Sequence, residues 1–367
     1  MRVALVGDEY PPVTGGAAVY AKELALHLSR LGVEVVVYTR EGAEEGEVEV
    51  RRLRGFGLLN RSLSPRLFAE LRRELRSGGF SVVHGTDMYS PLSLAALRFA
   101  KGAGLPSVIT CHSVHRSSGL WRVVHLPLTL LLRRADRVIA VSEASRGFCV
   151  CLGVPEEKVR VVPNGVDPSL FHEGVDGLWF RRRLGVGDGG KLVVAAMRLV
   201  RRKGPYLLLE AFSELAEEFP GLRLAVAGEG PEEEGMKRRV RERGLEGKVE
   251  FLGPLPHEEV AALMAGADLF VLPSFVEACP LAAMEAMAVG TPVVCPRAGG
   301  MLEFGKDGYN CLMFRPGDPS SLREAMARVL SDGGLARALR RGGLRTARRF
   351  TWERTARLTL RVYEEIA

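Results

Sequence analysis

The sequence has few cysteines, and none of their spacings marks a secreted or zinc-binding protein. The six cysteines are scattered, without a CxxC pair or the spacing of zinc ligands. The nearest two, Cys149 and Cys151, lie too close along a regular strand or helix to form a disulfide with each other. We therefore expect reduced thiols and a cytoplasmic location.

Long apolar runs are also absent. No run approaches the roughly 18 residues that a membrane-spanning helix needs, and the longest candidate, residues 123–132, includes a histidine and a proline. The chain opens with the strand-like stretch RVALVG rather than with a charged leader and a cleavage site. There is no GxGxxG fingerprint, which disfavours a nicotinamide cofactor, and no DxD-like carboxylate pair beside a strand.

The pattern of apolar segments indicates an α/β protein with two domains. At 367 residues the chain is long enough for two hydrophobic cores. Strands alternate with helical stretches throughout, which is typical of parallel, doubly wound sheets. A change of composition across residues 167–190 puts the domain boundary near 166–172. The predicted strands are 2–7, 33–39, 48–53, 81–84, 107–111, 137–141 and 159–162 in the first half, and 191–197, 222–227, 249–252, 268–272, 292–295 and 311–314 in the second.

The most informative motif is a pair of glutamates in the run PSFVEACPLAAMEAMAVGTPVV (273–294). Glu277 lies in a loop after an apolar strand, and Glu285 lies eight residues later in a predicted helix. Pro280 suits the first helical position, and Gly290 ends the helix. Strand ends and helix N-termini bind ligands and phosphate in such sheets, and carboxylates accept hydrogen bonds from sugar hydroxyls. From the spacing alone, a capping residue and an ordinary helix-face glutamate remain the alternative.

A second motif follows the strand 191–197. Arg198 lies at the end of this strand, and Lys203 lies five residues further, before a helix predicted from Tyr206 to Phe219. Fixed cations that face a helix N-terminus suit a pyrophosphate, which arginine binds with two hydrogen bonds and lysine as a point charge. The two arginines between them, 201 and 202, are expected to be solvated.

Two glycine-rich turns offer backbone N–H groups to a ligand. Gly15 and Gly16 follow the first strand and precede a helix, at a place where the backbone can come close to a ligand. Gly228 and Gly230 form a second turn in AGEGP. By itself, this second turn is more often a tight connection than a ligand site.

In order and spacing, these segments resemble the family 4 glycosyltransferases, which are retaining, nucleotide-sugar-dependent enzymes of the GT-B fold. The matching segments cover nearly the whole chain: EYPPVTGGAAVYAKELALHLSRLGVEVVVYT (9–39), PNGVD (163–167), MRLVRRKG (197–204), AGEGP (227–231), VEFLGPLP (249–256), the two-glutamate segment and GDPSSLREAM (317–326).

The resemblance implies two Rossmann-like, doubly wound domains that face each other across a cleft. The acceptor-side domain would span residues 1–168 and be completed by a C-terminal helix, 351–367, that crosses back to it. The donor-binding domain would span residues 169–350.

The resemblance also implies roles for individual residues. Arg198 and Lys203 would neutralise the leaving diphosphate, Glu277 would hold the hexose, and Glu285 would hold the ribose hydroxyls. His112, at the end of the strand 107–111, would lie near the transferred sugar and the leaving phosphate, with the alternatives His84 and His115. The other donor-binding residues would be Gly15, Gly16, Gly228, Gly230, Leu252, Ala278, Cys279 and Leu281.

The implied reaction moves a hexose from a nucleoside-diphosphate sugar to a hydroxyl of a glycan, lipid or small molecule. Configuration would be retained, no metal would be needed, and the departing phosphate would take the acceptor proton. No clear candidate for a carboxylate nucleophile is present. Where many members of the family have Gly-Phe-Gly, this chain has Ala278-Cys279-Pro280. Because Pro280 has no N–H, we expect a donor preference different from that of the better-known members.

Arginine is concentrated between residues 51 and 76. This stretch holds eight arginines and two glutamates, a net charge of +6, against +7 for the whole chain. It reads either as an amphipathic helix with a solvated face or as a surface for anionic lipid or a charged acceptor. Lipid-acceptor members of the family use this part of the first domain in the second way, so a peripheral contact with the inner membrane face is one expectation. Nucleic-acid binding is not expected, because no RNA- or DNA-binding module surrounds these residues.

Two other functions are compatible with the fold. The chain could be a GT-B isomerase such as a nucleotide-sugar 2-epimerase, although that enzyme type lacks the two-glutamate segment. It could also be a non-catalytic sugar-nucleotide-binding protein, which the presence of both glutamates and both cations disfavours.

Overall fold

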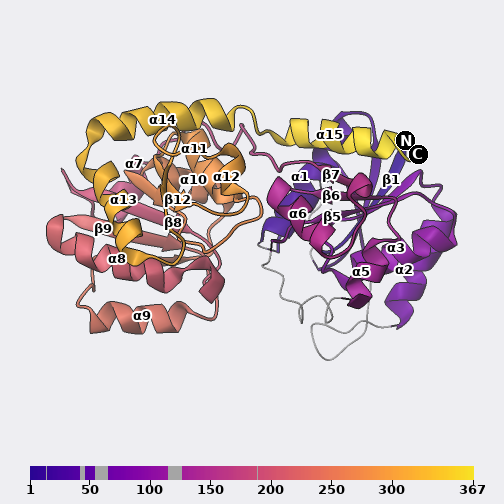
Figure 1. The fold of residues 1–367 in the computed structure, drawn as a ribbon, viewed down its shortest axis with the longest axis horizontal. Coiled ribbons are helices and arrows are strands. Elements are labelled where there is room, and N and C mark those ends of the chain that lie inside the picture. The colour runs from indigo at the N-terminus through magenta and orange to yellow at the C-terminus, as the bar shows by residue number, and fades with distance from the viewer. Residues whose placement is uncertain (14, 42–45, 54–64, 115–125, 188) are drawn as a thin grey trace. The chain divides into compact units, whose positions relative to one another are not determined.

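The structure is a computed structural model that describes residues 1–13, 15–41, 46–53, 65–114, 126–187 and 189–367 (Figure 1). The chain forms two compact units, Met1–Gly165 with Trp352–Ala367, and Val166–Thr351. The boundaries expected from the sequence, after residues 168 and 350, lie three residues and one residue away from these divisions.

The first unit contains a parallel sheet with the strand order β3-β2-β1-β4-β5-β6-β7. The order reverses between β1 and β4, which makes the sheet doubly wound. Its strands are β1 (Arg2–Glu9), β2 (Glu34–Glu41), β3 (Glu49–Arg52), β4 (Val82–Gly85), β5 (Ser107–Cys111), β6 (Arg137–Ala140) and β7 (Val159–Val161). Its helices are α1 (Gly16–Arg30), α2 (Pro65–Ser77), α3 (Pro91–Gly102), α5 (Leu126–Leu132), α6 (Glu143–Cys151) and α15 (Trp352–Glu364), with the 3₁₀ helix η1 (Glu156–Lys158).

The second unit repeats this plan with the strand order β10-β9-β8-β11-β12-β13, again all parallel. Its strands are β8 (Lys191–Ala196), β9 (Leu222–Ala227), β10 (Val249–Gly253), β11 (Leu269–Val271), β12 (Val293–Pro296) and β13 (Leu312–Phe314). Its helices are α7 (Leu178–Arg183), α8 (Pro205–Glu218), α9 (Glu233–Glu242), α10 (His257–Ala265), α11 (Leu281–Val289), α12 (Met301–Phe304), α13 (Pro319–Ser331) and α14 (Gly333–Ala347), with the 3₁₀ helix η2 (Arg201–Lys203).

Alternating side chains of each central strand enter two different cores, because helices cover both faces of the sheet. In β8, Val193 and Ala195 pack with helices α8, α9 and α13. Leu192 and Val194 pack with α10 and α11 on the other face. Figure 1 shows α8 and α9 on one side of this sheet and α10, α11 and α14 on the opposite side. The alternation explains why the strands are almost continuously apolar in sequence.

Several helix starts follow from local side-chain chemistry. The hydroxyl of Ser142 accepts a hydrogen bond from the Ser145 N–H at the start of α6, as expected for an N-cap serine. Asp318 caps α13 in the same way, with a proline at the first helical position. The prediction for Pro280 is wrong by one position: it is the N-cap residue of α11, with extended backbone, and Leu281 is the first helical residue.

The strands predicted from the sequence are confirmed, each with ends within two residues of the observed ones. The C-terminal helix α15 belongs to the first unit, as the resemblance implies. The Thr355 hydroxyl donates to the Pro163 carbonyl over 2.7 Å. The ring of Trp352 lies 6.1 Å from that of Tyr20 on α1. Helix α15 thus completes the core of the first unit, although the rest of that unit ends at Gly165.

Candidate functional site

The second unit brings two loops together at the point where its strand order reverses. One loop follows β8 and carries Arg198 and Lys203, and the other follows β11 and carries Glu277. The Phe275 N–H donates to the Arg202 carbonyl over 3.2 Å, which ties the two loops directly. Ligands of open α/β sheets bind at this kind of switch point.

Gly204 makes the close approach of these loops possible. It is the N-cap of α8 and has a φ of 67°, in the left-handed region that favours glycine. A Cβ at this position would lie 2.1 Å from the carbonyl oxygen of Pro273, which follows β11. The glycine therefore sets the distance between the basic turn and the glutamate loop.

Lys203 and Glu277 form an ion pair at this switch point. The ammonium lies 2.6 Å from Glu277 Oε1, and the side chains are 19% and 8% exposed. The buried Ser274 hydroxyl donates to the same carboxylate oxygen. With Oε1 engaged twice, Oε2 is the oxygen left to accept other hydrogen bonds. Arg198, on the same loop as Lys203, is exposed and has no side-chain partner within the described residues.

The AGEGP turn packs against the segment that carries Arg198. The Leu199 N–H donates to the Glu229 carbonyl over 2.8 Å, and the Glu232 N–H donates back to the Leu199 carbonyl. Gly228 has a φ of 115°, and a Cβ there would lie 2.1 Å from the Met197 carbonyl oxygen. A Cβ on Gly230 would lie 2.4 Å from the Leu199 carbonyl oxygen, so both glycines are needed for packing. Leu252, near the end of β10, is partly buried against one face of the sheet.

Helix α11 begins beside Glu277 without a side-chain cap. The residues between them, Ala278 and Cys279, are half-buried, and the Glu277 carbonyl accepts the Gly300 N–H over 2.8 Å. Leu281 is the first residue of the helix and is half-buried as well. The N-terminus of α11 and Glu277 Oε2 therefore both lie beside the short segment 278–280.

Glu285 lies in the second turn of α11 and is partly buried. No hydrogen bond or ion pair to its carboxyl occurs in the described part of the chain. Burial raises the pKa of this carboxyl from its ordinary 4.5 to about 7, because the ionised form loses hydration without gaining a partner. A hydroxyl group that donates a hydrogen bond to this carboxyl stabilises its ionised form.

In the first unit, Gly15 and Gly16 lie after β1, beside the switch point between β1 and β4. Gly15 is the N-cap of α1, and no side chain caps this helix. A Cβ on Gly16 would meet no atom within 4 Å. Among the described residues there is thus space beside Gly16, while Glu9 Oε2 lies 3.6 Å from a Cβ built on Gly15.

His112 directly follows β5, and its ring is fixed on two sides. Its Nε2–H donates to the Thr86 carbonyl over 3.0 Å, and the ring of Tyr20 packs edge-on at 4.5 Å. Burial lowers the pKa of His112, against the opposing effect of the nearby Asp87. The imidazole is therefore neutral near pH 7, with Nδ1 as a hydrogen-bond acceptor.

The two alternatives to His112 differ from it. His84 is fully buried in β4, and its ring nitrogens bond to the Tyr363 hydroxyl at 2.6 Å and the Thr110 hydroxyl at 2.7 Å. Burial lowers its pKa to about 3, so it is a neutral core residue that links α15 to the sheet. The alternative that His84 contacts the ligand is therefore wrong. His115 lies outside the described residues.

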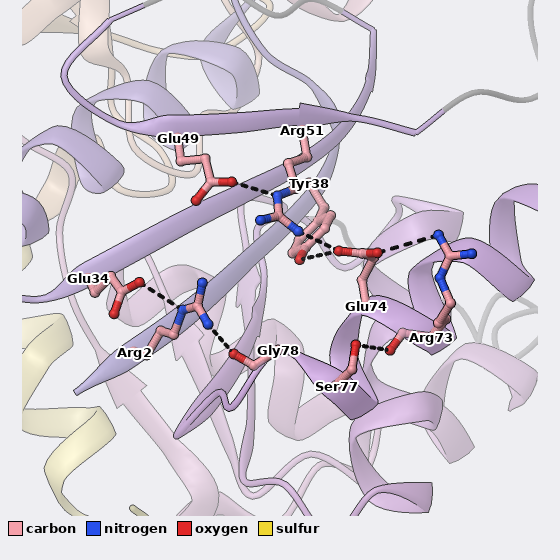
Figure 2. Close-up of polar contacts among 9 residues, drawn as sticks. All are labelled: Arg2, Glu34, Tyr38, Glu49, Arg51, Arg73, Glu74, Ser77 and Gly78. Atoms are coloured by element: carbon pink, nitrogen blue, oxygen red, sulfur yellow. Dashed lines mark hydrogen bonds and ion pairs between the residues drawn. The ribbon is translucent and has the colours of Figure 1, made fainter.

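The arginine-rich stretch 51–76 is only partly described, since residues 54–64 lie outside the described ranges. Figure 2 shows the contacts of Arg51, whose side chain is 42% exposed: it donates to Glu49 over 2.6 Å and to Glu74 of α2, and the Tyr38 hydroxyl also donates to Glu74. Burial raises the pKa of Tyr38 to about 12. The apolar face of α2 is buried in the core, and its exposed face carries Arg66, Arg72, Arg73 and Arg76.

The described ranges contain neither a metal-ligand cluster nor a membrane-spanning helix. No group of three or more His, Cys, Asp and Glu side chains is placed there to hold a metal ion. Among the helices so described, none combines the length and the apolar character that crossing a membrane requires.

Sequence reasoning missed the residues that hold the predicted ones in place. Ser274, Tyr20 and Thr86 each fix a candidate side chain, but the motifs did not assign a role to any of them. Ser274 lies three residues before Glu277, a spacing that could have suggested a turn bond. The contacts of Tyr20 and Thr86 join segments far apart in the chain, and no local pattern reveals them.

Comparisons with known proteins agree along the whole chain. The family pattern described as Glycosyltransferase Family 4 matches residues 14–170, and the pattern described as Glycosyl transferases group 1 matches residues 180–345. An uncharacterized glycosyltransferase of Methanocaldococcus jannaschii is 30% identical, covering 99% of this chain and 98% of that protein. A D-inositol 3-phosphate glycosyltransferase of Frankia alni is 31% identical, covering 95% of this chain and 94% of its own.

Among solved structures, Anabaena Alr3699/HepE in complex with UDP-glucose superimposes with a TM-score of 0.86. Its sequence identity is 21%, and all of both chains is covered. Sucrose-phosphate synthase from Thermosynechococcus elongatus gives a TM-score of 0.82 at 23% identity, covering 99% of this chain and 98% of that one. At these identities the likeness concerns the fold.

Proposed function

The chain belongs to the family 4 glycosyltransferases, within the glycosyl transferases group 1, and from this premise we propose that it transfers a hexose from a nucleoside-diphosphate sugar to an acceptor hydroxyl, with retention of configuration and without a metal ion. The observation that carries the proposal is the switch point of the second unit. There Lys203 and Glu277 pair at 2.6 Å, with the exposed Arg198 on the same loop.

The two cations stabilise the negative charge that grows on the departing diphosphate. Arg198 binds phosphate oxygens with two N–H groups, and Lys203 supplies a compact charge. Stabilising a developing oxyanion with preorganised groups is usually the largest catalytic contribution, and one such group is worth about 10²–10³ in rate. The ion pair with Glu277 keeps the Lys203 ammonium at the switch point, so little reorganisation is required.

Glu277 and the start of α11 bind the hexose. Glu277 Oε1 is occupied by Lys203 and Ser274, and Oε2 accepts hydrogen bonds from sugar hydroxyls. Backbone N–H groups near Ala278 and Cys279 donate to the sugar. Pro280 has no N–H to donate. A sugar hydroxyl that would accept from an N–H at this position must therefore find another donor, or the preferred sugar lacks that hydroxyl.

Glu285 binds the ribose. Its carboxyl has no partner within the described residues and a pKa raised to about 7. Two ribose hydroxyls that donate to the carboxylate would replace the hydration lost on burial and lower this pKa again. Gly228, Gly230 and Leu252 adjoin the base, which backbone groups recognise, while Gly15 and Gly16 present the N-terminus of α1 to the diphosphate.

His112 accepts a hydrogen bond from the transferred sugar. Its Nε2–H is used by the Thr86 carbonyl, so the ring meets the substrate through Nδ1, which in the neutral imidazole can only accept. A hexose hydroxyl suits this nitrogen, and a phosphate oxygen does not.

Retention follows if the acceptor attacks on the face that the diphosphate leaves. The bond from the anomeric carbon to the phosphate oxygen breaks, and the bond to the acceptor oxygen forms. The acceptor proton passes to the departing phosphate oxygen, so no side-chain base is needed.

The partners of the reaction are proposed in the same terms. The Anabaena neighbour's complex with UDP-glucose makes uridine the first base to test. The name of the relative from Frankia alni makes a phosphorylated cyclitol one acceptor to test beside glycans and lipids. The four exposed arginines of α2 support a peripheral contact with anionic lipid at the inner membrane face.

A thermal-shift screen of UDP-, GDP- and ADP-sugars tests the proposal. One nucleotide class should raise the melting temperature of the wild-type protein, and Lys203→Ala should abolish the rise. Arg202→Ala, with an exposed neighbouring arginine, is the matched control and should keep it. If the sugar nucleotide raised the melting temperature of Lys203→Ala as much as that of the wild type, Lys203 would not belong to the site.

A product assay separates this function from the two others that fit the fold. Transfer to an added acceptor with release of nucleoside diphosphate supports a transferase. A sugar nucleotide of unchanged mass but altered configuration, formed without acceptor, would indicate an epimerase. Binding without any product would indicate a non-catalytic protein.

A further inference from the structure

A pocket of about 560 Å³ opens on the second unit beside the turn that carries Lys203. Its wall runs from η2 over the first turn of α8 to the C-terminal end of α9, where Glu242 also lines the pocket. Pockets for small metabolites are typically about 300–1,000 Å³, so its size suits such a ligand. The charged residues of the candidate donor site do not line it: Arg198, Lys203, Glu277 and Glu285.

Three arginines converge on this pocket: Arg201 from η2, and Arg238 and Arg239 from α9. Arg201 pairs with Glu232 at 3.2 Å while remaining 86% exposed. Arg239 pairs with Glu242 at 3.8 Å, with both side chains about half exposed. Such exposed pairs contribute only about 0–1 kcal/mol, so an anionic ligand can displace them.

Arg238 is the arginine most available to a ligand. Within the described residues its side chain makes no hydrogen bond or ion pair. Its side chain is exposed and lines the same pocket as Tyr206. An exposed guanidinium that lines the pocket offers paired N–H groups for a phosphate.

The first turn of α8 adds backbone donors to the same wall. Tyr206 and Leu207 both line the pocket. The helix has 14 residues, and no side chain caps its N-terminus. Within the described residues, neither the Tyr206 N–H nor the Leu207 N–H meets an acceptor, so both groups add to the attraction that the arginines exert on an anion.

Two aromatic rings supply an apolar surface beside these donors. Phe275 lines the pocket and is 45% exposed. The Tyr206 hydroxyl donates to Glu232 over 2.9 Å. Gly235 on α9 leaves room for this hydroxyl, since a Cβ there would lie 2.1 Å from it. Aromatic faces together with arginines are the surroundings that a ring-bearing phosphate ester requires.

We propose that this pocket binds a phosphorylated ring compound, such as a sugar monophosphate, at a site separate from the donor site. The phosphate group is held by Arg201, Arg238 and Arg239 and by the open turn of α8, and the ring lies against Phe275. This inference goes beyond glycosyl transfer and does not depend on it.

Isothermal titration calorimetry with glucose 6-phosphate as the probe tests the inference, with glucose and inorganic phosphate as separate titrants. Glucose 6-phosphate should bind, glucose should not, and phosphate should bind at least tenfold more weakly than the ester. The double variant Arg238→Ala/Arg239→Ala should lower the affinity for the ester at least tenfold. Both arginines are exposed on α9, so the variant should fold.

Two control variants decide where the probe binds. Arg241→Ala removes an exposed arginine of the same helix that does not line the pocket, and Lys203→Ala changes the donor site. Both should bind the ester as the wild type does. Loss of binding in Lys203→Ala with retention in the double variant would place the probe in the donor site and overturn the inference. No binding to the wild type at millimolar ester, or an equal loss in Arg241→Ala, would overturn it as well.

Discussion

The two units share one topology but place different chemistry at their switch points. In the second unit, the loops that meet there carry a buried ion pair and a further exposed arginine. In the first unit, the corresponding strand ends carry the start of α1, which has no side-chain cap, and a neutral, hydrogen-bonded His112. The exposed arginines of α2 lie instead on a helix face that points away from its own core.

The contrast shows that the shared topology determines where a site can form, whereas the loop residues determine its chemistry. A charged switch point suits a leaving group that accumulates charge. A neutral one suits hydroxyl groups, which exchange hydrogen bonds without a change of charge. Under the proposed function, the second unit serves the charged leaving group, and four changes to the chain sharpen or break this comparison.

The largest effect is expected from the cations of the second unit. Lys203→Ala should lower kcat/KM about 10³-fold, because it removes a preorganised charge from the leaving diphosphate. Steady-state kinetics with the identified donor measures this, and Arg202→Ala should remain within about twofold of the wild type. Lys203→Arg, which keeps a charge beside Glu277, controls for loss of folding. A Lys203→Ala enzyme within tenfold of the wild type would contradict the assignment.

A smaller effect is expected at His112 in the first unit. His112→Ala should lower kcat on the order of 10–100-fold without changing the melting temperature by much, because it removes one hydrogen bond to the reacting sugar. The matched change, His84→Gln, should do the opposite. It breaks the buried contacts to Tyr363 and Thr110 and should lower the melting temperature while the folded enzyme keeps its kcat. If both variants changed kcat and the melting temperature alike, the assignment of His112 to the site and of His84 to the core would be contradicted.

A pH effect is expected from Glu285. Below pH 7 its carboxyl is protonated in the free protein, and only the ionised form accepts hydrogen bonds from both ribose hydroxyls. Nucleotide affinity should therefore rise as pH increases through 7, by up to about tenfold per unit below that pH. Calorimetry at pH 5.5, 6.5 and 8 should show this rise in the wild type and a flat profile in Glu285→Gln. A wild-type affinity that is independent of pH would separate Glu285 from the ribose.

The same group affects stability in a defined direction. Folding raises the pKa of Glu285 from 4.5 to about 7, so the folded protein holds the proton more tightly than the unfolded chain. Its contribution is fully present below pH 4.5 and is lost as pH rises through 7. Urea unfolding should show that this loss is absent in Glu285→Gln.

The smallest effect is expected on the outer face of α2. Arg66→Gln/Arg72→Gln should weaken binding to vesicles that contain anionic lipid by about 1 kcal/mol per arginine. Co-sedimentation at low and high salt measures this, with the Arg238→Ala/Arg239→Ala variant of the second unit as a control of equal charge change. Equal weakening by both pairs would mean that net charge, and not the α2 face, governs the contact.

The fold could be predicted in detail because its signals are local. Most strands are short apolar runs, and these runs placed the strands within two residues. The one-residue error at Pro280 has a physical reason. Proline lacks an N–H and suits both the N-cap and the first helical position, and the extended backbone that selects the N-cap follows from the loop before it.

The site could be predicted less fully, because its geometry depends on contacts between loops. The sequence indicated Lys203 and Glu277 as separate ligands for a diphosphate and a hexose, whereas the structure joins them in one ion pair with Ser274. The sequence could not distinguish His84 from His112, since both lie at strand ends. The partners that separate them, Tyr363 and Thr86, lie on elements remote in the chain.

The placement of α15 has a consequence for how the protein is made. During translation, the first unit leaves the ribosome long before the helix that carries Trp352 and Tyr363. Until that helix arrives, Tyr20 and His84 lack a covering layer. The nascent first unit should thus be the part of the chain that most needs protection from aggregation, although it is synthesised first.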